Sequence, residues 1–90
     1  LTGQPDDTGG LRLRGRLRAL LSDFDGALAD FNRALTLRPD DPTLVAGKAE
    51  TLRRAGRLAE ARLAVRQGLE RVPGNETLTS LADRLASEGG

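Results

Sequence analysis

The sequence predicts an all-α fold, in which about five helices form a short array of repeats. The first observation is a spacing of 34 residues, at which Pro5-Asp6-Asp7, Pro39-Asp40-Asp41 and Pro73-Gly74-Asn75 recur. Residues at this spacing also keep their size class where identity is lost, as Phe31 and Val65 do. The third observation is that residues typical of helix ends stand where such a repeat needs them.

The first expected helix covers residues 11–21, where the sequence also allows another structure. Leucine and arginine alternate through most of the run from Leu11 to Arg18, and alternation is the period of a half-buried strand. We favour a helix because nothing in the run is β-branched and because four leucines fall on one helical stripe. These are Leu13, Leu17, Leu20 and Leu21.

The second and third expected helices cover residues 23–37 and 42–55. Asp41 suits the N-cap of the third helix because its carboxylate can accept hydrogen bonds from free backbone amides. Pro42 at the first helical position loses no hydrogen bond there. Gly56 can adopt the left-handed conformation that ends this helix, and Pro39 lies just beyond the end of the second helix.

The fourth and fifth expected helices cover residues 58–72 and 76–87. Pro73 closes the fourth helix and Asn75 is suited to cap the fifth. Gly68 stands inside the fourth helix, where a glycine costs about 1 kcal/mol of helix propensity unless packing offsets it. We therefore interpret Gly68 as a point of close contact between helices.

Two segments of the chain share a pattern of small residues, one bulky residue and a closing proline. The first copy has Gly15, Ala27, Phe31, Ala34 and Pro39, and the second has Ala49, Ala61, Val65, Gly68 and Pro73. This pattern resembles the tetratricopeptide repeat, a helix-turn-helix unit of 34 residues. The resemblance implies a short right-handed α-solenoid with repeats at residues 8–41 and 42–75, and a capping helix with a flexible end at 76–90. Residues 1–7 are expected to be the tail of a preceding repeat or a flexible N-terminus.

The sequence departs from this family at positions that often carry Trp or Tyr. Leu11 and Arg18 stand at these positions in the first repeat, where looser packing of the first helix is therefore expected. Arg14 and Lys48 precede the small residue of the first helix in each repeat, and we assign both to structure rather than to binding.

The composition argues against catalysis. The chain has no Cys and no His, so it lacks thiolate chemistry, the usual acid-base group and the commonest metal ligand. The pairs Asp23/Asp25 and Asp40/Asp41 stand at helix starts, where capping and the helix dipole explain acidic residues without chemistry. The sequence therefore predicts a protein that is not an enzyme and has no metal or cofactor.

Charge and hydropathy restrict the expected partners. No apolar stretch approaches the roughly 18 residues that span a bilayer, and no signal-peptide pattern occurs in these 90 residues, so membrane insertion is not expected. A soluble chain is expected, and the cytoplasm is favoured over other compartments without being identified. The formal net charge of +1 predicts no strong general attraction to nucleic acid. Nucleic-acid or polyanion binding through the Arg-rich first helix stays an alternative, although Trp, Tyr and His are absent for base stacking. The arginines concerned are Arg12, Arg14, Arg16 and Arg18.

The resemblance implies that a partner binds on the concave face, which the first helix of each repeat lines. Arginine presents paired donors that match carboxylates, so an acidic peptide is the ligand class that this face favours. The competing interpretation is that these arginines form a solvated surface. The predicted partner-binding residues are Arg12, Arg16, Ala46, Glu50, Arg53 and Arg84, and the same face includes Ala19, Leu20, Thr43, Arg54, Thr77 and Ser80.

The function expected from these features is that of a non-catalytic scaffold or adaptor that binds another protein or peptide. A further alternative is a structural module that self-associates through the exposed ends of the array.

Overall fold

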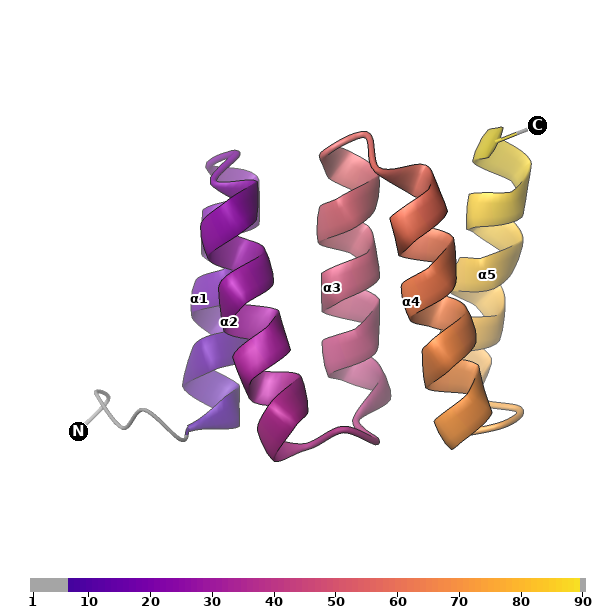
Figure 1. Ribbon diagram of the computed structural model, residues 1–90, viewed down its shortest axis with the longest axis horizontal. Coiled ribbons are helices and arrows are strands. Elements are labelled where there is room, and N and C mark those ends of the chain that lie inside the picture. The colour runs from indigo at the N-terminus through magenta and orange to yellow at the C-terminus, as the bar shows by residue number, and fades with distance from the viewer. Residues whose placement is uncertain (1–6, 90) are drawn as a thin grey trace.

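The computed structural model describes residues 7–89, and their regular structure is entirely helical, as predicted (Figure 1). Residues 1–6, and with them most of the predicted tail at 1–7, lie outside the described residues, as does Gly90. Residues 7–89 form five helices that follow one another along the chain. They are α1 (Thr8–Leu20), α2 (Phe24–Leu37), α3 (Pro42–Arg54), α4 (Leu58–Arg71) and α5 (Glu76–Gly89).

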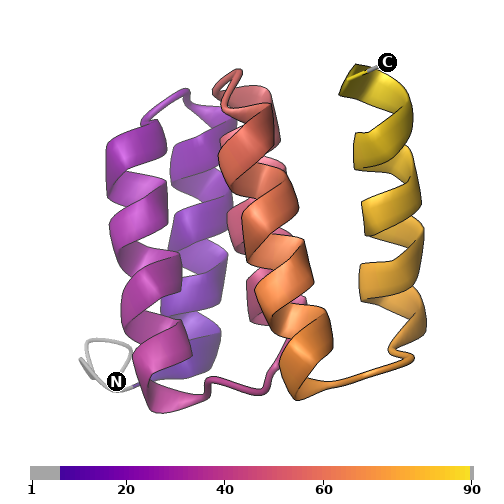
Figure 2. The same ribbon diagram turned by 45° about the vertical axis from the view of Figure 1, so that its right-hand side comes forward.

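The helices form two layers of a helical repeat solenoid. α1, α3 and α5 lie side by side in one layer, and α2 and α4 form the other (Figures 1 and 2). Each helix packs against the next one along the chain, and α3 lies against all four of the others. The stack extends 43 Å along its longest axis.

The predicted helix ends are confirmed by their backbone geometry and hydrogen bonds. The Asp41 carboxylate accepts from the backbone N–H of Thr43 at 2.9 Å, with Pro42 at the first helical position. The Asn75 side-chain oxygen accepts from the backbone N–H of Leu78 at 3.1 Å. Gly56 has φ +80°, the left-handed conformation that a side chain would strain.

Four of the ten helix bounds agree with the predicted ones, and the other six differ by one to three residues. α1 begins at Thr8 instead of Leu11, and its first turn closes with the Leu11 N–H donating to the Asp7 carbonyl at 2.9 Å. α5 continues to Gly89 instead of ending at Ser87. Both extensions include glycines, which have low helix propensity: Gly9 and Gly10 in α1 and Gly89 in α5.

Glycines let neighbouring helices approach closely within a repeat and between repeats. A Cβ atom added to Gly15 of α1 would lie 2.9 Å from the Phe31 ring of α2, and one added to Gly47 of α3 would collide with the same ring from the other side. A Cβ at Gly68 of α4 would lie 2.7 Å from Val45 of α3 and 3.0 Å from Leu78 of α5. The prediction that Gly68 is a contact point is therefore confirmed.

The core follows this arrangement in two buried clusters. One contains Leu11, Phe31, Ala34 and Leu44 and joins α1, α2 and α3. The other joins α3, α4 and α5, and α5 contributes three leucines to it. Those three are Leu78, Leu81 and Leu85.

The segment that could also have formed a strand is a helix, α1, as predicted, but its leucine stripe is not its buried face. Leu13, Leu17, Leu20 and Leu21 are exposed, whereas Leu11, Gly15 and Ala19 are buried. The physical reason is that small residues, not leucines, give the Phe31 ring its room beside α1.

Candidate binding groove

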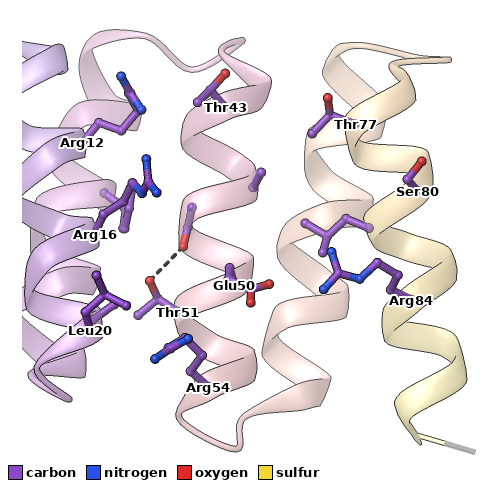
Figure 3. Close-up of a pocket in the computed structure, with 15 residues that line it drawn as sticks. Arg12, Arg16, Leu20, Thr43, Glu50, Thr51, Arg54, Thr77, Ser80 and Arg84 are labelled. Atoms are coloured by element: carbon purple, nitrogen blue, oxygen red, sulfur yellow. Dashed lines mark hydrogen bonds between the residues drawn. The ribbon is translucent and has the colours of Figure 1, made fainter.

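A groove of about 530 Å³ runs across the layer formed by α1, α3 and α5. Figure 3 shows side chains from all three helices directed toward it. Its lining combines charged, hydroxyl and apolar groups. The lining residues are Arg12, Arg16, Ala19, Leu20, Phe31, Thr43, Ala46, Gly47, Glu50, Thr51, Arg54, Thr77, Ser80, Leu81 and Arg84.

The charge of the groove is dominated by arginine. Arg12 and Arg16 come from α1, Arg54 from α3 and Arg84 from α5, against Glu50 as the one acidic lining residue. Within the part of the chain that the structure describes, none of these four guanidinium groups has a hydrogen bond or an ion pair to another side chain. Four unpaired cations around one concave surface are suited to bind an anionic ligand.

Other arginines of the chain are already engaged. Arg14 donates two hydrogen bonds to the Asp30 carboxylate, at 3.0 and 2.8 Å, and Arg18 donates to the same carboxylate at 3.2 Å. The hydrogen bond to Asp30 raises the pKa of Arg14 further above its ordinary value. Arg14 therefore has the structural role predicted for it. Arg18, which stands where the family often has an aromatic residue, binds the buried Asp30 carboxylate instead.

Glu50 lies in the groove, and its negative charge is paired with Arg53 of the same helix. Arg53, one turn further along α3, donates to the Glu50 carboxylate and also lies 3.6 Å from the Glu88 carboxylate. The hydrogen bond from Arg53 lowers the pKa of Glu50, and the charges of Arg84 and Arg54 add to this effect against the cost of partial burial. Glu50 is thus ionised at neutral pH and keeps Arg53 occupied.

Hydroxyl and apolar groups complete the surface between the charges. Thr43, Thr77 and Ser80 are exposed along the groove and can exchange hydrogen bonds with a bound backbone. The Thr51 hydroxyl is already used, because it donates to the Gly47 carbonyl at 2.8 Å (Figure 3).

The structure brings together most of the residues predicted to bind a partner. Arg12, Arg16, Ala46, Glu50 and Arg84 line the groove. Arg53 does not, because its side chain turns to Glu50 and Glu88. Whether the lining residues bind a partner stays a prediction.

Four lining residues were absent from the prediction. Gly47, Thr51 and Leu81 belong to α3 and α5, and the last two are buried, whereas Phe31 belongs to the other layer of helices. The sequence carried a partial indication of these residues, because Gly47 and Thr51 are small or polar residues spaced four apart on the face of α3 that meets α2.

The aspartates considered for acid-base work have structural positions. Asp23 accepts from the backbone N–H of Gly26 at 3.0 Å and caps α2, as Asp41 caps α3. Asp40 pairs with Arg71 at 3.2 Å. None of these carboxylates lines the groove.

A family model described as tetratricopeptide repeat matches residues 19–85. A comparison with curated proteins found no match. Among the described residues, no helix combines the length and the apolar character needed to cross a membrane.

Proposed function

The chain belongs to the tetratricopeptide repeat family, and from this premise we propose that it binds an acidic, extended segment of a partner protein in the groove formed by α1, α3 and α5. Repeats of this family generally mediate protein–protein interactions and are typically non-catalytic. The observation that carries the proposal is the set of four arginines in the groove without side-chain partners, Arg12, Arg16, Arg54 and Arg84.

The electrostatics and the shape of the groove favour such a ligand. Guanidinium groups bind carboxylates through two parallel hydrogen bonds, so an acidic peptide can gain specific contacts as well as long-range attraction. The hydroxyl groups between the arginines offer partners for its backbone. The arginines come from three helices, so a segment bound to all of them would cross the layer instead of following one helix.

The alternative of nucleic-acid binding draws less support from the structure. It depended on the four arginines of α1, and two of these, Arg14 and Arg18, are engaged with Asp30. That leaves Arg12 and Arg16 on this helix to contact phosphates.

The test is the affinity of the chain for an eight-residue labelled peptide that alternates Glu and Ala, measured by fluorescence anisotropy. The variant Arg16→Glu/Arg84→Glu reverses two charges in the groove. The matched control, Arg38→Glu/Arg66→Glu, makes the same charge change at exposed residues outside it. We expect the groove variant to weaken binding at least about tenfold, because each charged hydrogen bond contributes about 1.5–3 kcal/mol.

Two further arms complete the experiment. A peptide with Gln in place of Glu should bind far more weakly, and raising the salt concentration should weaken binding of the acidic peptide. Equal losses in the groove and control variants would contradict the proposal. A single-stranded oligonucleotide that bound more tightly than the peptide, with the same loss in the groove variant, would favour the alternative instead.

A further inference from the structure

A furrow runs along the second layer of helices, between α2 and α4. In the described chain the backbones of these two helices each approach α3 closely but do not approach one another, and α3 is visible between them in Figure 1. Two cavities of about 320 and 190 Å³ lie along this furrow, and Asn32, Lys48, Ala64 and Gln67 line both of them. None of the described residues lines both the furrow and the binding groove, so the two surfaces are separate.

Lys48 carries the unpaired charge of this furrow. It is half-buried, and among the described side chains its ammonium group has no hydrogen bond and no ion pair. The other charged lining residues are paired, because Arg57 donates twice to the Glu60 carboxylate at 2.7 Å. Arg71 likewise pairs with Asp40 at 3.2 Å. The hydrogen bond from Arg57 is the main reason why the pKa of Glu60 is lowered, and the charge of Lys48 adds a smaller effect without binding this carboxylate.

The repeat register shows which partner Lys48 lacks. The residue 34 positions before it is Arg14, which donates two hydrogen bonds to the Asp30 carboxylate. The equivalent of Asp30 in the second repeat is Ala64, which lines the furrow together with Lys48. Both basic residues were predicted to be structural, but of the two it is Arg14 that has an ion pair supporting this role. A carboxylate from another molecule would give Lys48 the kind of partner that Asp30 gives Arg14.

The groups around Lys48 suit an extended peptide. Asn32 of α2 and Gln67 of α4 are exposed on the two sides of the furrow, and within the described residues neither side chain has a hydrogen bond. A carboxamide has both a donor and an acceptor, which match the C=O and N–H groups of an extended backbone. Between them Val45 and Ala64 are buried and apolar, so the furrow offers one charge within an otherwise uncharged surface.

We propose that the furrow between α2 and α4 binds an extended segment of a partner protein through one acidic side chain, whose carboxylate pairs with Lys48. The residues beside this acid are uncharged, because the other cations of the furrow are already paired and a second acid would meet the Glu60 carboxylate. Asn32 and Gln67 hold the backbone of the segment. This site does not depend on the proposed function of the groove.

The probes are an array of seven-residue peptides with blocked ends. The central residue is Glu, Gln or Lys, and the other positions vary among uncharged amino acids. Binding of the chain to the array identifies the preferred peptides, and fluorescence anisotropy gives their affinities. We expect peptides with a central Glu to be selected, and the best of them to bind at least about tenfold more tightly than its Gln and Lys counterparts.

Charge reversal at Lys48 gives the sharpest test. Lys48→Glu should change the preferred central residue from Glu to Lys, a result that loss of folding could not produce. Lys48→Arg should keep the preference for Glu, and Lys48→Gln should bind the best peptide at least about tenfold more weakly. Arg66→Glu is the matched control, because it makes the same charge change at an exposed residue of α4 outside the furrow.

Lys48 is also the single lysine of the chain, which allows a direct test of contact. A carbodiimide joins a carboxylate to an amine as an amide without a spacer, and the carbodiimide itself takes up the lost water as a urea. Peptide mapping by mass spectrometry should therefore find the central Glu of the best peptide attached to Lys48.

Four outcomes would overturn the proposal. The first is that no peptide with a central Glu binds better than its Gln counterpart. The second is that Lys48→Glu keeps the preference for Glu, and the third is that the peptide is joined to the terminal amine of the chain and not to Lys48. The fourth is that the groove variant Arg16→Glu/Arg84→Glu loses this binding as fully as Lys48→Gln does, because the peptide would then lie in the groove.

Discussion

Asp30 has an environment unlike that of its equivalent in the second repeat. It is 3% exposed and accepts hydrogen bonds from Arg14 and Arg18. Its equivalent in the second repeat is Ala64, and the equivalent of Arg18 is Leu52, both of which are buried in a hydrophobic cluster. The same place in the fold is thus filled by an ionic cluster in one repeat and by hydrocarbon in the other.

Replacing the ionic cluster by its hydrocarbon counterpart should leave the fold intact. We expect Arg18→Leu/Asp30→Ala to keep or raise the melting temperature, because buried ion pairs often contribute no more than apolar residues of similar volume. Arg14 is more than half exposed and can be solvated once Asp30 is gone. Thermal unfolding followed by circular dichroism measures the effect.

The matched variant is Arg14→Ala/Arg18→Ala, which leaves the Asp30 carboxylate buried without these partners. Its melting temperature should fall by roughly 5 °C or more, since an unpaired buried charge is strongly destabilising. A greater loss of stability in Arg18→Leu/Asp30→Ala than in this variant would contradict the account.

The sequence could not predict this cluster, although it indicated where to look. Arg18 was noted as a departure from the aromatic residues of the family, but its partner lies 12 residues away on another helix. An aspartate inside a helix is usually exposed, so only the packing of α1 on α2 identifies Asp30 as buried.

At the scale of the helices, the Phe31 ring of α2 fits between Gly15 of α1 and Gly47 of α3. At the seam between α4 and α5, the small residue is Gly68 instead, where an added Cβ would lie 3.0 Å from Leu78. Each seam therefore has its own matched set of side-chain volumes, and a residue exchanged at one helix should require a change on its neighbour.

A double-mutant cycle tests this matching. Gly47→Ala should destabilise the chain by about 1–3 kcal/mol, because its Cβ would collide with the Phe31 ring. The higher helix propensity of alanine offsets part of this loss. Phe31→Val should destabilise it as well by leaving a cavity. The combined variant should lose less than the sum, since the smaller side chain makes room for the new methyl group.

Urea unfolding gives the free energies for this cycle. Gly9→Ala is the control, because a Cβ there has room, with its nearest neighbour the Asp7 carboxylate at 3.4 Å. We expect it to be neutral or stabilising by up to about 1 kcal/mol. Strict additivity of Gly47→Ala and Phe31→Val would show that the two residues do not share one space.

Helix positions were the most predictable feature at this scale. Asp41 and Asn75 cap the starts of helices and Gly56 follows the end of one. Each acts through its own side chain or backbone conformation, so the sequence alone identified them. Which face of α1 is buried was less predictable. Amphipathic periodicity favours the leucine stripe, but contact with α2 is made by Leu11, Gly15 and Ala19. Side-chain hydrophobicity gives no indication that a glycine will be buried by a neighbouring ring.

At the scale of the whole molecule, α5 is part of the core that it shares with α3 and α4. It supplies Leu78, Leu81 and Leu85, and the Arg62 guanidinium of α4 donates to the Leu85 carbonyl at 2.9 Å. The outward side of α5 is polar, with Thr79 and Asp83 exposed. The capping role expected for residues 76–90 stays a prediction.

Deleting residues 76–90 should therefore unfold the chain or reduce it to a weakly helical state. Each of the three buried leucines contributes about 1.5–3 kcal/mol, which together approaches the whole stability of a small domain. Circular dichroism at 222 nm measures the loss, with Asp83→Asn as a control on the exposed side of α5. A truncated chain as helical and as heat-resistant as the parent would show that α5 is dispensable for folding.

The groove was predicted in outline because repeats place equivalent residues on one surface. The family resemblance therefore located Arg12, Arg16 and Arg84 without any knowledge of their contacts. It could not show that Arg53 is held by Glu50 and Glu88, since Glu88 belongs to another helix and that pairing depends on the packing of α3 against α5.

The central place of α3, which lies against every other helix, has a consequence for how the chain moves. When α1 and α2 loosen, α3 still has α4 and α5 on its other side, and the reverse holds at the opposite end. We therefore expect local opening to start at the two ends of the described row of helices, and the backbone amides of α3 to be the last to exchange their hydrogens with solvent.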